Sequence, residues 1–345
     1  MPNEIAGEDS RIGWSGTISV EQSANWIMPW RIPIKDRALF VEQLVEKAAM
    51  PAGVKLSFQS DADWVNIKCN ASDDRSPLDL FINGEFRKTV DTVGVTEIRF
   101  DSLGPGNKVF EAWLPQYGEF RFGGLRLSEG SYFSAHKSKN LPRWVTYGSS
   151  ITQCREAYSP SLTWPSIVAR SRKNDLTCLG YGGQCHLDPL IARVIRDRDA
   201  DLISLCLGIN IYGNASLNER TFGSGIIGFI EIIREKHPDT PMVIFSPIYS
   251  PDREVYPNAV GFTLSQMRVE IEEAVRRLYK HGDRNIHYVN GLDIFNEKHA
   301  HLLPDGLHPN TEGYGIMAAN MLTALEQFCP KQNDLVGRNL PCPRW

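Results

Sequence analysis

Short apolar runs broken by turn residues fill the chain from about residue 11 to 133. Runs of this length, with turn signals between them, predict closely spaced antiparallel strands. The pair Asn83-Gly84 stands between Ile82 and Phe86 and predicts a tight hairpin, because a type I′ turn needs positive φ at both central residues. The expected strands are residues 54–60, 64–70, 78–82, 85–90, 95–100, 108–113 and 119–127. We therefore predict an antiparallel, jelly-roll-like β-sandwich here.

After residue 132 the pattern changes to short apolar runs that alternate with longer segments of helical periodicity. The expected strands are 144–147, 176–179, 201–207, 242–246 and 286–289, and the expected helices are 163–172, 190–198, 225–236, 264–279 and 311–328. Such alternation predicts a three-layer αβα sandwich around a five-stranded parallel sheet, which is an α/β fold. In open sheets of this kind ligands bind beyond the carboxyl ends of the strands, so chemistry is expected just after each strand.

The two patterns predict two domains and a tail. A chain of 345 residues exceeds the size of one ordinary core, since domains hold roughly 150 residues. The polar stretch 134–140 is the expected linker, and the tail contains Gly337, Pro341 and Pro343. We predict a β-sandwich domain over 1–138, a catalytic domain over 139–330 and an irregular tail over 331–345.

Candidate chemistry begins with Ser150, which follows the first strand of the α/β part in a turn of small residues. A serine hydroxyl is a weak nucleophile and needs a base, which a third group must orient. Asp305 and His308 stand together in one short loop near the C-terminus. We predict that Asp305 holds the His308 ring and that His308 faces Ser150, which makes these three residues a catalytic triad.

Acyl transfer also needs hydrogen-bond donors for the oxyanion of the tetrahedral intermediate. Two loops after the second and third strands of the α/β part offer them: a glycine-rich turn with Gly183, and a turn with Asn210. The glycine-rich turn can bring a backbone N–H close to a ligand, and Asn210 places a side-chain amide at the same edge of the sheet. Each motif alone is weak evidence, because such short patterns are common in turns.

Taken together and in this order, the motifs resemble those of the SGNH (GDSL) hydrolase superfamily over roughly residues 142–328. The resemblance implies a serine nucleophile at Ser150, an oxyanion hole with Gly183 and Asn210, and an Asp-x-x-His pair at Asp305 and His308. We predict that the backbone N–H groups of Ser150 and Gly183 and the side-chain amide of Asn210 are the donors of this oxyanion hole. It also implies the SGNH, flavodoxin-like fold. The N-terminal part looks like the β-sandwich that precedes the catalytic domain in one subgroup, whose members include carbohydrate esterases and acyltransferases.

Two positions depart from the family pattern. Ser149 stands where the family has the aspartate of Gly-Asp-Ser, and Ile211 stands where it has the aspartate of Gly-x-Asn-Asp. Neither change removes a residue of the predicted triad or oxyanion hole. The departures affect which subgroup of the family we expect more than they affect the expected class of reaction.

The composition of the chain limits which binding partners and which cellular compartment we expect. The chain is 42% hydrophobic and 23% charged with a formal net charge of −4, which is typical of a soluble globular protein without a basic face for nucleic acid. The N-terminus has no signal-peptide pattern, and no apolar run reaches the roughly 18 residues needed to span a membrane. Seven scattered cysteines predict reduced thiols. We therefore expect a cytoplasmic protein that binds neither nucleic acid nor membrane.

Several residues near these motifs have two interpretations. His186 either contacts substrate or caps the following helix, and Cys154 and Cys185 either line the pocket or are buried. His299 and His301 have a spacing seen in metal sites, but no third ligand is evident nearby, so we expect no metal and no cofactor.

The roles of two aromatic residues and of a basic cluster are also open to interpretation. Trp164 is expected to anchor the helix after the nucleophile loop, and Tyr212 is a candidate wall of an acyl pocket. The cluster most simply forms a solvated helix end, and alternatively it holds the phosphates of an acyl-CoA. It consists of Arg193, Arg196 and Arg198.

The sequence predicts a serine ester hydrolase that acts on a small acylated molecule or a carbohydrate ester through an acyl-enzyme on Ser150. One alternative is an acyltransferase with the same triad, which moves an acyl group, for example from acyl-CoA, to a hydroxyl of a small acceptor. A second alternative is a non-catalytic protein that binds carbohydrate through sandwich aromatics, although most such residues lie in cores. These aromatics are Trp26, Trp30 and Trp64.

Overall fold

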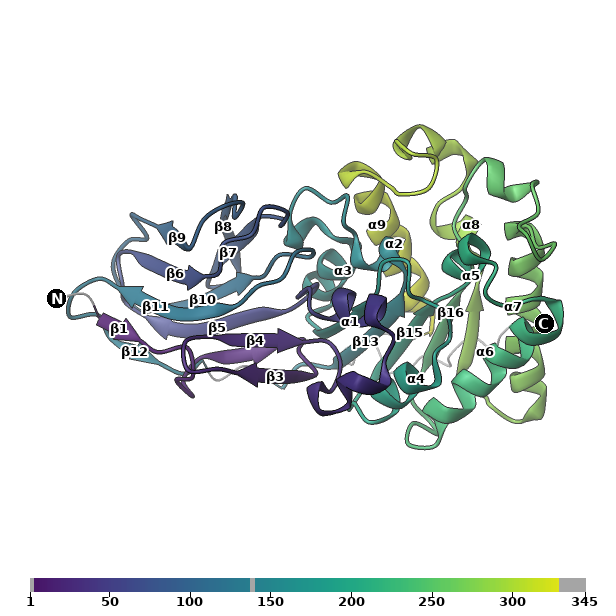
Figure 1. Ribbon diagram of the computed structural model, residues 1–345, viewed down its shortest axis with the longest axis horizontal. Helices are drawn as coiled ribbons and strands as arrows, with labels where there is room; N and C mark the ends of the chain where they lie inside the picture. Colours follow the sequence, from purple (N-terminus) through teal and green to yellow (C-terminus); the bar gives the residue numbers. More distant parts are fainter. Residues whose placement is uncertain (1–2, 137–139, 329–345) are drawn as a thin grey trace. The chain divides into compact units, whose positions relative to one another are not determined.

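A computed structural model describes residues 3–136 and 140–328 of the chain (Figure 1). The described chain divides into two compact units. The first runs to Leu141 and includes two short later pieces, Tyr158–Ser161 and Leu176–Cys178. The second holds the other residues from Pro142 onward. Part of the predicted linker and the whole predicted tail lie outside the described residues.

The first unit contains two six-stranded antiparallel sheets, as predicted. One sheet consists of β1 (Asn3–Ile5), β3 (Ser19–Gln22), β4 (Ile27–Trp30), β6 (Val65–Cys69), β9 (Glu97–Phe100) and β11 (Phe122–Leu127). The other consists of β2 (Gly13–Ser15), β5 (Lys55–Ser60), β7 (Leu78–Ile82), β8 (Glu85–Val90), β10 (Lys108–Trp113) and β12 (Phe133–Ser134). The hairpin between β7 and β8 is confirmed, since Asn83 and Gly84 have φ values of 54° and 81°.

The core of this unit comes from alternating positions on the strands. In β5 every second side chain is buried, and Phe58 stacks on Phe110 of β10 with ring centroids 4.8 Å apart. The sequence analysis named no strand before residue 54, although β1 to β4 lie there with η1 (Ile34–Leu39) and α1 (Glu42–Ala48). The strands β1 and β2 are too short to show a period, and β4 is buried on both faces and contains Pro29.

The second unit contains the predicted five-stranded sheet. Its strands are β13 (Arg143–Gly148), β14 (Asp175–Gly180), β15 (Leu202–Cys206), β16 (Met242–Phe245) and β17 (Ile286–Val289), in the spatial order β14-β13-β15-β16-β17. The neighbours from β13 to β17 along this order pair in parallel. Nearly all residues of β13, β15 and β16 are buried, as expected for a parallel sheet covered on both faces.

Helices cover the two faces of this sheet (Figure 1). On one face α3 (Trp164–Arg172) packs against α9 (Thr311–Phe328). On the other, α6 (Glu219–Arg234) packs between α4 (Pro189–Arg196) and α7 (Leu264–His281). The prediction for α6 began six residues too late, because the sequence analysis missed the capping box that Asn218 forms with Thr221.

Short helices occupy the connections, and the sequence analysis did not predict them because four to six residues are too few to display a 3.6-residue period. They are α2 (Ser150–Gln153), α5 (Ile209–Asn214) and α8 (Gly291–Ile294), with 3-10 turns at η2 (Pro160–Leu162), η3 (Asp252–Glu254) and η4 (Glu297–Leu302). No described helix has both the length and the apolar character that a membrane crossing requires.

The strand order creates one point at which the winding of the sheet reverses. The chain passes from β13 outward to β14 and then returns to β15 on the other side of β13. In doubly wound sheets the loops at such a reversal diverge and leave a crevice for ligands. The loop after β13 begins α2 at Ser150, and the loop after β15 leads to Asn210 in α5.

The end of β14 packs so closely against α2 that it requires glycine. A Cβ added to Gly180 would lie 2.3 Å from the Gln153 backbone nitrogen and 2.6 Å from the Thr152 carbonyl carbon. Neither backbone atom can yield without moving α2, the helix that begins at Ser150.

We predict that Gly180→Ala lowers the free energy of unfolding by about 1–3 kcal/mol, the usual effect of overpacking. Gly228→Ala is the matched control, because Gly228 lies exposed in α6 and an added Cβ meets no atom within 4 Å. The control should be neutral or slightly stabilising, since alanine favours helix. Urea unfolding followed by circular dichroism measures both. Equal stability of the two variants would contradict the close contact.

Candidate active site

Ser150 is the first residue of α2, and local contacts fix this helix. The Ser149 hydroxyl caps it by accepting a hydrogen bond from the Ile151 N–H at 3.2 Å. The indole of Trp164, which is fully buried, donates to the Ile151 carbonyl at 2.8 Å. The predicted anchoring role of Trp164 is thus confirmed. The Ser150 side chain is half-buried at the carboxyl edge of the sheet.

A chain of two hydrogen bonds links Ser150 to His308 and Asp305. The Ser150 Oγ lies 2.8 Å from His308 Nε2, and His308 Nδ1 lies 2.6 Å from Asp305 Oδ2. The second carboxylate oxygen, Oδ1, accepts the backbone N–H groups of Leu307 at 2.9 Å and of His308 at 2.7 Å. Asp305 therefore orients the His308 ring and the loop that carries it.

The charge on Asp305 determines the direction of these hydrogen bonds. Partial burial alone would raise the Asp305 pKa, but the hydrogen bonds from the His308 backbone, the His308 ring and the Leu307 backbone outweigh it and lower the pKa from 3.8 to about 2. The ionised carboxylate only accepts hydrogen bonds, so His308 Nδ1 carries the proton. In the neutral ring Nε2 is then the acceptor, and the Ser150 hydroxyl donates to it.

The glycine-rich turn after β14 lies against the nucleophile helix. The Gly182 N–H donates to Gln153 Oε1 at 2.8 Å, and a Cβ added to Gly182 would be 3.6 Å from the Ser150 Cβ. Gly183 has a φ of +74°, and a Cβ added there would meet no atom within 4 Å. This turn thus has open space beside it. The His186 Nε2 lies 2.9 Å from the Gly183 carbonyl oxygen and must donate to it, which steadies the turn.

Asn210 lies in the first turn of α5, and its amide is oriented from the same glycine-rich loop. Its Oδ1 accepts the Cys185 N–H at 3.0 Å, which leaves its Nδ2 as a donor. Among the described residues, no hydrogen bond engages this Nδ2 or the N–H groups of Ser150 and Gly183. The structure thus joins Ser150, His308 and Asp305 directly. Gly183 and Asn210 are linked to each other through Cys185, and the Gly182 N–H links their loop to Gln153 in the helix that begins at Ser150.

An apolar cavity lies beside α2, on the inner side of the nucleophile loop. Its volume is about 30 Å³, which is room for little more than one water molecule. Residues from the loops after β13, β15 and β16 and from α9 line the cavity, among them Ser149, Ile151, Cys206, Phe245, Ser250 and Met317.

Some of the open interpretations can now be resolved. His186 does not cap α4, whose N-cap is Asp188; it bonds Ser216 as well as the Gly183 carbonyl. Cys154 and Cys185 are buried, so the expectation that they pack as small apolar residues is confirmed.

Outside this site, the basic cluster and the sandwich aromatics have ordinary contacts. Arg196 pairs with Asp197 at 3.0 Å and with Glu235 at 2.6 Å, as expected for a solvated helix end. Trp30 is buried, whereas Trp26 and Trp64 are half-buried beneath arginine guanidinium groups. Tyr212 donates its hydroxyl to the Tyr256 carbonyl at 2.9 Å. The His299 Nδ1 accepts the Asn296 N–H at 3.4 Å.

Two residues at the site were missed from the sequence. Gln153 holds the glycine-rich turn, and Ser250, in the loop after β16, donates its hydroxyl to the Gly306 carbonyl at 2.6 Å. A signal for Ser250 existed, since the rule of searching after each strand applies to β16 as well.

Comparisons with known proteins give a family for each of the two parts of the chain. The GDSL-like lipase/acylhydrolase family matches residues 142–325, and the N-terminal domain of SsfX3 matches residues 12–122. No curated protein sequence matches the chain significantly.

Among solved structures, a salicylyl-acyltransferase, SsfX3, from a tetracycline biosynthetic pathway is 31% identical, covers 96% of this chain and 99% of its own, and has a TM-score of 0.88. A protein described as a GDSL-like lipase from Bacteroides ovatus is 20% identical, with coverage of 95% and 98% and a TM-score of 0.80. A family two carbohydrate esterase from Cellvibrio japonicus is 14% identical, with coverage of 95% and 98% and a TM-score of 0.70. The last two likenesses show the fold alone.

The lowered pKa of Asp305 predicts a pH-dependent contribution to stability. A carboxyl whose pKa is 3.8 unfolded and about 2 folded stabilises the folded state above about pH 4, and this contribution is lost as the pH falls toward 2. Asp305→Asn should therefore lower the free energy of unfolding more at about pH 5 than at about pH 3. Urea unfolding of both proteins at the two pH values measures the difference. A difference that does not change with pH would contradict the hydrogen-bonded, ionised Asp305.

Proposed function

This chain belongs to the GDSL-like lipase/acylhydrolase family, and we propose that it cleaves an acyl ester through an acyl-enzyme formed on Ser150. The observation that carries the proposal is the hydrogen-bond chain from the Ser150 hydroxyl through His308 to Asp305. This chain gives the serine a base, and it gives the base a carboxylate that orients it. The proposed substrate is a small acylated molecule or a carbohydrate ester.

In the first step Ser150 Oγ attacks the ester carbonyl carbon while its proton moves to His308 Nε2. The imidazolium that forms is stabilised by the ionised Asp305 at 2.6 Å. Collapse of the tetrahedral intermediate breaks the bond to the leaving oxygen, which takes the proton from His308 Nε2. The acyl group is then bonded to Ser150 Oγ, and the alcohol departs.

The oxyanion of the intermediate needs donors that are already in place. We propose that the N–H groups of Ser150 and Gly183 and the Asn210 Nδ2 serve this purpose. The contact between Asn210 Oδ1 and the Cys185 N–H supports the role of Asn210, because it orients the amide before substrate arrives. Each such donor contributes roughly 3 to 4 kcal/mol to stabilisation of the transition state.

In the second step a hydroxyl group attacks the acyl-enzyme, and His308 takes its proton. With water as the acceptor the product is a free acid, and the enzyme is the esterase that the sequence predicts. Ser150 recovers its proton from His308 when the acyl group leaves.

A second candidate function is acyl transfer to a hydroxyl of a small-molecule acceptor. One observation favours it: this chain and the salicylyl-acyltransferase SsfX3 are 31% identical in sequence, and the match spans nearly all of both chains. The first step and the residues that perform it are the same. Transfer differs only in that an alcohol reaches the acyl-enzyme faster than water does.

We predict that Ser150→Ala lowers kcat for p-nitrophenyl ester hydrolysis by about 10⁴-fold or more, as for other serine nucleophiles. Ser171→Ala, at an exposed position of α3, is the control and should retain wild-type turnover. An ester series from acetate upward measures the effect and the acyl preference together. Undiminished turnover by Ser150→Ala would exclude Ser150 as the nucleophile.

Asn210→Ala should lower kcat by about 10²–10³-fold, because one oxyanion donor is lost, and should change KM much less. Steady-state kinetics with the best ester of the series measures both constants. A rise in KM at unchanged kcat would instead place Asn210 in substrate binding.

Analysis of the products shows whether water or an alcohol accepts the acyl group. Wild-type enzyme, an ester or acyl-thioester donor and an added alcohol are incubated together, and the products are resolved by mass spectrometry. Free acid as the main product supports the esterase. An acylated alcohol that increases with alcohol concentration supports the transferase.

A further inference from the structure

The loop between β16 and α7 contacts the loop that carries Asp305 and His308. Ser250 is 1% exposed and donates its hydroxyl to the Gly306 carbonyl oxygen at 2.6 Å. Arg253 Nη1 donates to the Ser250 Oγ at 3.0 Å, and it lies 3.4 Å from the same carbonyl oxygen. Gly306 directly follows Asp305 and stands two residues before His308 in sequence, so a bond to its carbonyl holds their loop from outside.

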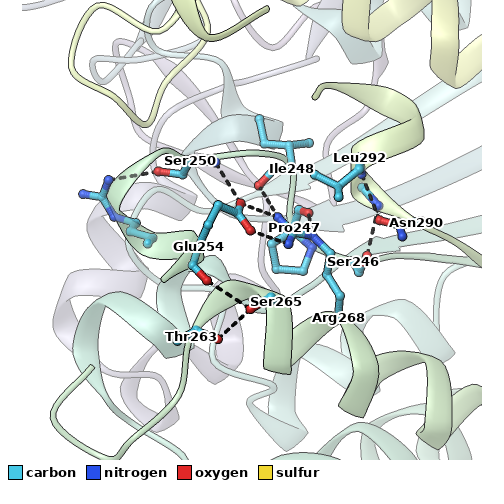
Figure 2. A network of polar contacts seen from close by, with 12 residues as sticks. Ser246, Pro247, Ile248, Ser250, Glu254, Thr263, Ser265, Arg268, Asn290 and Leu292 are labelled. Atoms are coloured by element: carbon cyan, nitrogen blue, oxygen red, sulfur yellow. Dashed lines mark hydrogen bonds and ion pairs between the residues drawn. The ribbon is translucent and has the colours of Figure 1, made fainter. Parts of the chain in front are cut away.

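A buried ion pair in turn holds Ser250 (Figure 2). The Ser250 N–H donates to Glu254 Oε1 at 3.1 Å. Arg268 of α7 grips the Glu254 carboxylate with two hydrogen bonds of 2.6 Å, and the two side chains are only 6% and 15% exposed. The same guanidinium donates to the Pro247 carbonyl at 2.8 Å and to the Ile248 carbonyl at 3.2 Å. One arginine therefore fixes the loop at three places.

This network differs in role from the contacts within the Asp305 loop. The bonds from Asp305 Oδ1 to the Leu307 and His308 N–H groups set the shape of that loop. They do not set its distance from Ser150, which lies on another element. The bond from Ser250 ties the loop to the carboxyl end of β16, and β16 and β13 both pair with β15 in the same sheet.

We propose that Ser250 is a positioning residue that holds His308 at reacting distance from Ser150, and that the Arg268–Glu254 pair keeps Ser250 in place. This inference rests on the proposed function, because it assigns His308 the role of base. Reacting groups tolerate little displacement, since a misplacement of about 1 Å can cost about 10²-fold in rate. Loss of the Ser250 hydroxyl should therefore slow attack by Ser150 without weakening ligand binding.

The test uses a fluorophosphonate probe on the full chain. Ser150 Oγ attacks the phosphorus, fluoride leaves, and the serine proton passes to His308 and then to solvent. Labelling at increasing probe concentrations gives a maximal rate and a half-saturating concentration, and mass spectrometry locates the label. We expect Ser250→Ala to lower the maximal rate by about 10- to 100-fold, with little change in the half-saturating concentration.

A second buried ion pair provides the matched control. Arg234 and Asp283 also form two hydrogen bonds, of 2.7 and 3.0 Å, and their side chains are 10% and 12% exposed. Arg268→Met and Arg234→Met should both lower the thermal midpoint, because each leaves a buried carboxylate unpaired. Only Arg268→Met should slow labelling. If Arg268→Met does not fold, Ser250→Ala still tests the proposal alone.

A spectroscopic readout separates positioning from general loosening. The proton between His308 Nδ1 and Asp305 should give a low-field NMR resonance in the wild type and in Arg234→Met. We expect it to persist in Ser250→Ala, because the hydrogen bonds within the Asp305 loop remain. Slow labelling beside an intact resonance marks a loss of position, whereas loss of the resonance would indicate general loosening and would contradict the proposal.

The outcomes distinguish the two proposals. A wild type that is not labelled at Ser150 would overturn the proposed function and the inference with it. A labelled wild type with equally fast labelling of Ser250→Ala would overturn the inference alone. Equal slowing of Arg234→Met and Arg268→Met would also overturn it, because the effect would then follow stability.

Discussion

The parallel pairing of β13 with β15 is the constraint on which the candidate site depends. Backbone hydrogen bonds between these neighbours keep the ends of the two strands together, although α3, β14 and α4 intervene in sequence. Both faces of the sheet are covered by helices, so the strand ends are where side chains of the sheet and its loops can reach a ligand. The reversal of strand order at this pair separates the flanking loops and gives Ser150 and Asn210 space at one edge.

The sequence could predict those parts of the fold in which hydrophobic residues recur with a regular period or in which residues typical of one turn type occur. Strands such as β5, in which every second side chain is buried, and long helices such as α9 have bounds within a few residues of the expectation, because burial repeats along them. The first fifty residues lack such a signal. Their strands are short, and β4 is buried throughout, so neither an alternating pattern nor a turn marks them.

The same distinction applies to the candidate site. Asp305 and His308 interact across one turn, so their relation could be inferred from spacing alone, and Ser150 was found because it ends a predicted strand. The resemblance to a family supplied the oxyanion residues. Ser250 reaches Gly306 across 56 residues of sequence, and no local pattern encodes a hydrogen bond of that range. Such contacts depend on how α7 and the last loops pack, which only the folded chain displays.

The grip of Arg268 on the loop after β16 also limits how this scaffold could diverge or be redesigned. Loops at the edge of a parallel sheet are where related enzymes exchange segments to change specificity. Here, a transplant that replaced only residues 247–254 would remove Glu254 and leave the buried Arg268 of α7 without its carboxylate partner. The loop and the first turns of α7 therefore form one module whose two parts have to be exchanged together. Tyr256 is exposed in the segment between Glu254 and α7, so an insertion beside it would leave both partners of the ion pair in the chain.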